Sequence, residues 1–149
     1  MDGEYDIPQD IYDRVFELLV SIVNSSAVDD FVMGGILKQQ LLDYCQEQTA
    51  AGRGSGFLWE AIGDVTQDPV EKMIHYQRAL THALRNREPT HTVLMELGDL
   101  YAEAGDPEKA RIHYDSALRE SIERGDLDRE GRAATSLITL DNSQLPDAG

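Results

Sequence analysis

Histidine and cysteine are the side chains through which this sequence could most readily bind a metal ion or act as a nucleophile. His75 and His82 are seven residues apart and would share a helix face, but no third ligand accompanies them in the sequence. His91 is expected in a loop, and His113 has the same sequence context as His75. Cys45, the single cysteine, lies at an apolar helix position and has no positive neighbour that would lower the pKa of its thiol. We therefore expect a buried, unreactive thiol, no disulfide and no metal site.

Carboxylates are the other candidates, because two acids that meet in a pocket can act as acid and base. Glu96, Asp99 and Glu103 recur at spacings of three and four and would share one helix face, where water and not a substrate is the expected neighbour. The segment GRGSG at 52–56 superficially suits phosphate binding, but no strand precedes it and no GKS or GKT element accompanies it. The sequence contains no catalytic constellation, so we expect a protein that is not an enzyme and uses no cofactor.

Helices must position these side chains, since apolar residues recur at spacings of three and four along most of the chain. In the second expected helix, Gly34 and Gly35 cost roughly 1 kcal/mol each against alanine, which indicates either a close helix contact or a break. Ser26 and Asp29 are its expected capping residues. The sequence predicts an all-α protein of about seven helices, over 8–24, 31–45, 57–65, 69–87, 92–104, 107–124 and 127–140.

Part of the sequence repeats at a constant offset. The segment IHYQRAL at 74–80 returns as IHYDSAL at 112–118, and Asp-Pro at 68–69 returns at 106–107, in both cases 38 residues further on. Gly63 and Gly98 are only 35 residues apart, so the first helix of the earlier repeat, or its turn, should be three residues shorter. Gly98 and Ala110 are expected to be small because facing helix backbones approach each other there.

These residues resemble the tetratricopeptide repeat (TPR), a family of helical hairpins, and the Gly105-Asp106-Pro107 turn between two expected helices strengthens the likeness. The resemblance is good over 57–118 and weaker up to 140. It implies a short right-handed solenoid within one compact domain. We expect a divergent N-terminal hairpin and Gly-rich linker over 1–56, repeats with a C-terminal capping helix over 57–140, and a tail over 141–149.

The resemblance also implies a binding surface, because the first helix of each TPR hairpin lines a groove. Family members that clamp a peptide's terminal carboxylate have lysine and asparagine at these positions, whereas this sequence has acids and a methionine. A segment bearing arginine or lysine beside an apolar anchor is therefore the expected ligand, and charge reversal at Asp99 and Glu103 should weaken binding with little effect on stability. The implied partner-binding residues are Phe57, Glu60, Asp64, Thr92, Met95, Asp99, Ala102 and Glu103.

The net charge of −15 limits the classes of partner. Nucleic acids and anionic membranes bind to basic surfaces, so neither is expected, and a basic protein is favoured. The imbalance is strongest in residues 1–30, which hold eight acids and one arginine. No apolar run approaches the ~20 residues of a membrane span, and the acidic opening does not resemble a signal peptide, so a cytoplasmic location is expected.

Three functions remain open at this point. The first is a non-catalytic protein-binding module, most specifically an immunity-type inhibitor that neutralises a basic toxin or effector, because short TPR-like chains are similar to some bacterial immunity and adaptor proteins. The second is a chaperone or adaptor for a secreted or assembling protein. The third is a metal-dependent regulator or enzyme, for which only the histidines and the acidic helix face argue. The expected state is a monomer or a weak homodimer.

Overall fold

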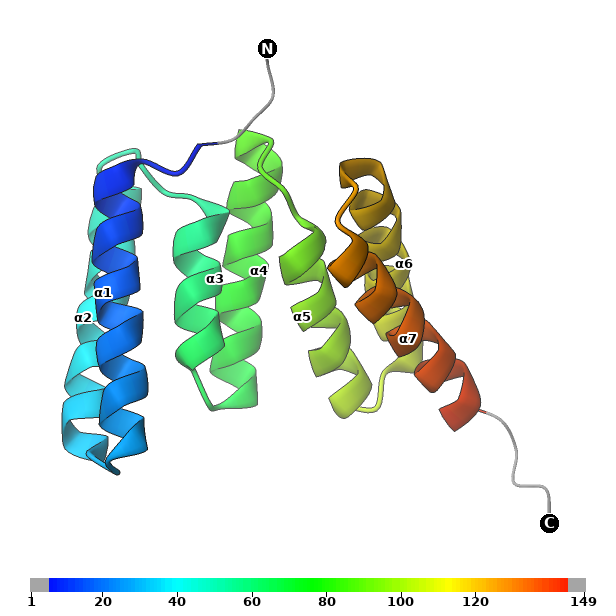
Figure 1. Cartoon of the computed structure of the whole chain (residues 1–149), viewed down its shortest axis with the longest axis horizontal. Coiled ribbons are helices and arrows are strands. Elements are labelled where there is room, and N and C mark those ends of the chain that lie inside the picture. The colour runs from blue at the N-terminus through cyan, green and yellow to red at the C-terminus, as the bar shows by residue number, and fades with distance from the viewer. Residues whose placement is uncertain (1–5, 145–149) are drawn as a thin grey trace. The chain divides into compact units, whose positions relative to one another are not determined.

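The computed structural model describes residues 6–144, and the regular elements in this range are all α-helices, which confirms the predicted all-α class. After Glu88 the chain divides into two compact units, α1–α4 and α5–α7 (Figure 1). The helices are α1 (Gln9–Ala27), α2 (Phe31–Ala50), α3 (Gly56–Val65), α4 (Pro69–Asn86), α5 (His91–Glu103), α6 (Pro107–Arg124) and α7 (Leu127–Ser143).

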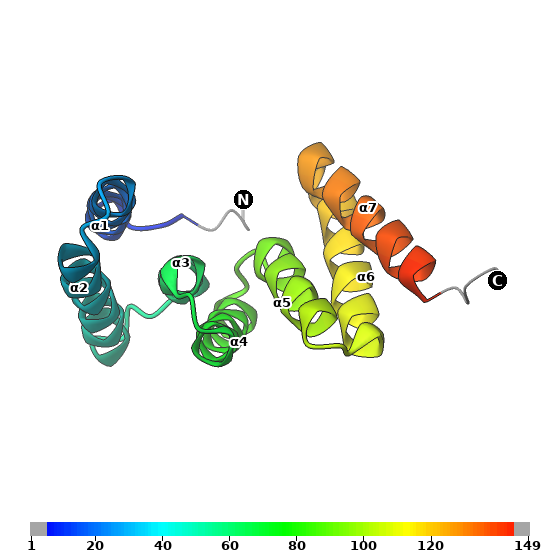
Figure 2. The same cartoon turned by 90° about the horizontal axis from the view of Figure 1, so that it is seen from below.

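The first unit contains two helical hairpins, α1–α2 and α3–α4, and α3 packs against both helices of the first hairpin. Figure 2 shows α1 beside α2 and α3 beside α4. One stripe of α1 is buried because its apolar residues recur at helical spacing. The core of this unit includes Ile11, Val15, Leu18, Ile22, Leu41, Cys45, Leu58, Trp59, Ile62, Tyr76, Ala79 and Ala83.

Helix α2 passes through Gly34 and Gly35 without a break. A Cβ atom on Gly34 would lie 3.2 Å from the Ser25 hydroxyl oxygen, so the close contact, and not the break, explains this glycine. The predicted caps are wrong, because Asp30 is the N-cap and its carboxylate accepts a hydrogen bond from the Met33 N–H at 3.0 Å. This cap stands one residue beyond Asp29, directly before the first helical residue.

The predicted Gly-rich linker is short and anchored. Helix α2 continues to Ala50, and Ser55 already caps α3 by accepting a hydrogen bond from the Leu58 N–H. Between them, the Arg53 guanidinium contacts the Asp10 carboxylate at 2.7 Å, and the Asn86 amide donates to the Gly54 carbonyl at 3.0 Å. These contacts hold the segment against α1 and α4.

The two hairpins that carry the sequence repeat differ as predicted, since α3 has 10 residues and α5 has 13. Their glycines, however, face aromatic rings and not a helix backbone, so the predicted close approach of backbones is wrong for Gly98. A Cβ atom on Gly63 would lie 2.5 Å from Cε1 of Tyr76, and one on Gly98 would lie 2.5 Å from Cε1 of Tyr114. Each glycine leaves the space that the following tyrosine ring fills.

The second unit is built on α6, which packs against both α5 and α7. The turn before α6 follows the predicted chemistry: Gly105 has φ +80°, and the Asp106 carboxylate accepts from the Lys109 N–H at 3.1 Å. Helix α7 extends to Ser143, so the predicted tail begins later, and its residues 145–149 lie outside the described range. The core cluster of this unit consists of Met95, Ala110, Tyr114, Ala117, Ala133 and Leu140.

Within residues 6–144, none of the helices combines the length and the apolar composition needed to cross a bilayer.

Candidate functional site

An open pocket of about 520 Å³ lies in the second unit between α5, the start of α6 and α7. Two of the predicted partner-binding residues, Asp99 and Ala102, line its α5 side. Thr135, Ser136 and Thr139 of α7 also line it, and these residues were missed in the sequence. The resemblance therefore located one helix of this pocket and not the other.

The α7 side of the pocket is a row of hydroxyl groups. Thr135, Thr139 and Ser143 are spaced by four residues, which places them on one helix face. Helix α7 also packs on the core of the unit, through the buried side chains of Ala133 and Leu140. The Ser143 hydroxyl donates to the Leu140 carbonyl at 2.7 Å, whereas the hydroxyls of Thr135 and Thr139 can donate to and accept from a peptide backbone. This side of the pocket therefore suits a polypeptide ligand.

Asp99 is fixed at the α5 side of the pocket by two neighbours. Its Oδ1 accepts a hydrogen bond from the Tyr114 hydroxyl at 2.6 Å, and its Oδ2 contacts Nη2 of Arg132 at 2.8 Å. Burial, together with the hydrogen bond to Asp99, raises the pKa of Tyr114 above its usual value, so the phenol remains a donor. Arg132 also contacts Glu96, at 3.3 Å. Asp99 therefore ties α5 to α6 and α7 as well as lining the pocket.

This network changes the expectation for Asp99. Asp99→Asn should lower the free energy of unfolding of the second unit by about 1 kcal/mol, because it removes the ion pair with Arg132 and weakens the acceptor for Tyr114. Glu103→Gln, at an exposed position of the same helix, should change it by less than about 0.5 kcal/mol. Urea denaturation of both variants tests this, and equal effects would contradict a structural role for Asp99.

The other predicted residues of α5 have different environments. Met95 is completely buried in the core cluster and offers no surface to a partner, so its predicted place in a groove is wrong for this unit as folded. Thr92 and Ala102 are half-buried, and Glu103 is exposed. Among the predicted residues, Ala102 and Glu103 follow Asp99 most closely on α5 and keep accessible surface.

The predicted residues of α3 lie in the first unit. Phe57 stacks on Tyr12 of α1, with ring centroids 6.0 Å apart. Glu60 is half-buried, and Asp64 is exposed and accepts a hydrogen bond from the Tyr76 hydroxyl at 2.6 Å. The Asp64–Tyr76 contact repeats the Asp99–Tyr114 contact, so both aspartates support the packing of their own hairpins.

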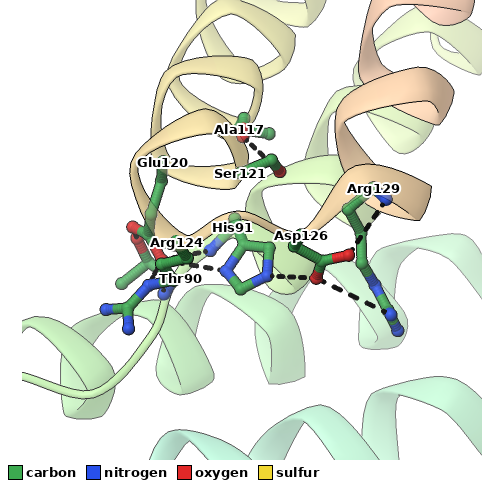
Figure 3. Close-up of polar contacts among 8 residues, drawn as sticks. All are labelled: Thr90, His91, Ala117, Glu120, Ser121, Arg124, Asp126 and Arg129. Carbon is green, nitrogen blue, oxygen red and sulfur yellow. Dashed lines mark hydrogen bonds and ion pairs between the residues drawn. The ribbon is translucent and has the colours of Figure 1, made fainter.

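His91 was predicted in a loop, and that prediction is wrong. It is the first residue of α5 and is buried, with Nδ1 2.9 Å from Oε2 of Glu120 and Nε2 2.9 Å from Oδ2 of Asp126 (Figure 3). Glu120 also accepts hydrogen bonds from the N–H groups of Thr90 and His91 at 2.7 and 3.0 Å, which satisfies the free amides at the start of α5. The cluster joins α5, α6 and the N-cap of α7.

A glutamate also caps the start of α3. The Gly56 N–H donates to Oε1 of Glu88 at 2.9 Å, and Glu88 is a buried residue just after the end of α4. In each of the two hairpins that carry the sequence repeat, a glutamate from the end of the second helix, or just beyond it, caps the first helix. We assign the His91 cluster to this structural role, since its polar atoms are bonded to one another.

His75, His82 and the cysteine are also explained by packing. His75 and His82 share a face of α4, as predicted, and both stack on Trp59 of α3, with centroid distances of 6.0 and 6.4 Å. The described residues contain no group of three or more side chains suited to hold a metal ion. The Cys45 thiol donates to the Leu58 carbonyl, and burial raises its pKa to about 12.

Comparison of the sequence with protein-family models and with curated proteins gave no match. The TPR resemblance therefore rests on the repeated residues of this chain itself.

Proposed function

We propose that this protein is a non-catalytic, TPR-like binding module that captures a basic protein partner. The observation that carries the proposal is the pocket of the second unit. Asp99 and Ala102, chosen as ligand-facing from the repeat pattern, line it together with the hydroxyls of α7. Both oxygens of Asp99 are bonded within the protein, so the hydroxyl row would bond the backbone of an extended peptide segment, and exposed acids such as Glu103 of α5 would pair with its arginine or lysine.

The charge of the chain supports a basic partner. With 28 acidic and 13 basic residues, the chain attracts positively charged proteins over long distances and speeds their association. The most specific form of the proposal is an immunity-type inhibitor that masks a basic toxin or effector in the cytoplasm. An effector that acts on nucleic acid would need a basic surface for its substrate, and an acidic protein could cover that surface.

A chaperone or adaptor is the second candidate, and one observation favours it. Tyr12 and Phe16 of α1 are 44% and 56% exposed, which is an unusual position for two aromatic rings. A protein that escorts an incompletely assembled client needs accessible apolar surface of this kind.

Co-expression with a basic protein encoded beside this one tests the two candidates. An inhibitor should abolish the toxicity of that neighbour, whereas a chaperone should raise the amount of a harmless client. In either case the Kd of the purified complex should rise about tenfold or more between roughly 50 and 500 mM NaCl, because screening shortens the range of the attraction.

Charge variants locate the contact. Neither Glu103 nor Glu123 lines the pocket, but Glu103 directly follows the lining residue Ala102, whereas Glu123 of α6 is at least nine residues from any lining position. Glu103→Lys should therefore weaken the complex, and Glu123→Lys should bind as the unchanged protein does. An affinity independent of salt, or equal losses in the two variants, would contradict the proposal.

A further inference from the structure

Helix α1 carries two apolar stripes, and only one of them is used by the core. Ile11, Val15, Leu18 and Ile22 form the buried stripe. The second stripe is displaced by about a third of a turn and remains exposed, with exposed fractions between 41% and 62%. Together with Phe57 of α3 it forms what we call the α1 aromatic face, which consists of Tyr12, Phe16, Val20, Val23 and Phe57.

The aromatic rings of this face are held in place by stacking. Tyr12 lies 6.1 Å from Phe16 and 6.0 Å from Phe57 between ring centroids, with interplanar angles of 8° and 16°. The row therefore runs along α1 and across to α3 without help from a ligand. A surface whose side chains are already ordered loses little conformational entropy when a partner binds.

Acidic residues accompany the face along α1. Asp10, Asp13 and Glu17 are exposed and occupy the neighbouring stripe of the same helix. Over residues 6–30 the sequence has six acids and one base, Arg14. Arg14 contacts Glu17 at 3.3 Å and Arg53 contacts Asp10 at 2.7 Å, so two of these three acids are paired and the group keeps an excess of one negative charge beside the aromatic row.

We propose that the α1 aromatic face docks an amphipathic helix of the partner protein, with large apolar residues on one face and arginine or lysine beside them. The exposed apolar side chains of α1 recur every three or four residues along the helix, so a partner helix lying along α1 could contact all of them. These side chains are Tyr12, Phe16, Val20 and Val23. The acids select among occupants: a second copy of this chain would bring like charges together, and an anionic membrane would be repelled, whereas a basic helix is attracted. This inference rests on the proposed function and adds a second contact surface, in the first unit, to the pocket of the second.

A model peptide tests the face directly. The probe is a synthetic, fluorescently labelled 18-residue helix with leucines at positions i, i+4, i+7 and i+11 flanked by arginines, and its reference has glutamate in place of each arginine. The probe should bind the full chain by fluorescence anisotropy, and the reference should bind at least about tenfold more weakly. Amide NMR shifts caused by the probe should concentrate in α1 and α3.

Two variants of the first unit provide the matched comparison. Phe16→Gln should raise the Kd for the probe about tenfold, whereas Leu84→Gln, which replaces a 64% exposed apolar residue of α4, should leave it within about twofold. Absence of probe binding, equal effects of the two variants, or shifts confined to α5–α7 would overturn the proposal. So would self-association, seen by sedimentation, that Phe16→Gln abolishes.

Capture of the native partner by the unchanged protein and by Phe16→Gln distinguishes failure of this proposal from failure of the proposed function. If Phe16→Gln captures the partner as well as the unchanged protein does, the α1 aromatic face is not its docking surface and the proposed function stands. If the unchanged protein itself captures no basic partner from co-expression, the proposed function fails, whatever the probe peptide does.

Discussion

Gly98→Ala is expected to lower the free energy of unfolding of the second unit by about 3 kcal/mol. The added Cβ atom would lie 2.5 Å from Cε1 and 2.6 Å from Cδ1 of Tyr114, far inside van der Waals contact. The ring has little room to move, because Tyr114 is 4% exposed and belongs to the core cluster. Its hydroxyl is also held by Asp99, so a displaced ring would lose that hydrogen bond as well.

Gly131→Ala is the matched control for this substitution. Gly131 also lies inside a helix, α7, but a Cβ atom there would meet nothing within 4 Å. The control should gain about 0.5–1 kcal/mol from the better helix propensity of alanine. Urea denaturation followed by circular dichroism measures both variants, and a Gly98→Ala protein as stable as the control would show that the ring does not need the space.

The hairpins could be predicted from sequence because their turns depend on local chemistry. Gly105, Asp106 and Pro107 each suit one position of a helix–turn–helix, and the structure uses them in those positions. The shorter first helix of the earlier repeat followed from the 35-residue spacing of Gly63 and Gly98 alone. Local signals and a repeated offset were enough for the order and type of the helices.

The environment of each glycine could not be predicted in the same way. A small residue at a helix contact indicates that something approaches closely, but not whether this is a backbone or a ring. Tyr114 follows Gly98 by 16 residues, and only the packing of α6 on α5 brings its ring to the glycine. The sequence did hold one signal for the ring contact. The Gly-Asp pair recurs at 63–64 and 98–99, and the next helix of each repeat carries a tyrosine, Tyr76 or Tyr114.

The candidate site was predicted in part for a related reason. The repeat pattern marked Asp99 and Ala102 on α5, but the resemblance is weaker beyond residue 118 and marked no ligand-facing residue on α7, which supplies the hydroxyl row. His91 was missed because its partners Glu120 and Asp126 are 29 and 35 residues away in sequence. Long-range polar contacts of this kind leave no local periodicity.

Glu120→Gln is the second substitution with a large expected effect, a loss of about 2 kcal/mol in the free energy of unfolding of the second unit at pH 7. Burial alone would raise the pKa of Glu120, but hydrogen bonds from Thr90, His91 and Arg124 lower it to about 2 (Figure 3). Folding therefore stabilises the ionised form of Glu120 more than the protonated form. Glutamine keeps the size of the side chain and removes the charge that His91 and Arg124 face.

The effect of this substitution should depend on pH in a defined direction. The pKa of Glu120 falls from an ordinary value of 4.5 to about 2 on folding, so the stabilisation is complete above about pH 5 and is lost as the pH falls towards 2. The difference in stability between the unchanged protein and Glu120→Gln should shrink over the same interval, since protonated glutamate and glutamine are both neutral. Asp126, whose pKa is also lowered, first by its hydrogen bond from His91, is present in both proteins.

Urea denaturation at several pH values between about 2 and 7 measures this dependence. Glu123→Gln is the control, because Glu123 lies on the same helix, is exposed, and should give a difference below about 0.5 kcal/mol at every pH. A Glu120→Gln deficit that stays constant down to pH 2 would mean that the glutamine disturbs packing and that the charge of Glu120 does not stabilise α5. A deficit that disappears with acid would establish the charged cap as the contact that holds the start of α5 to α6.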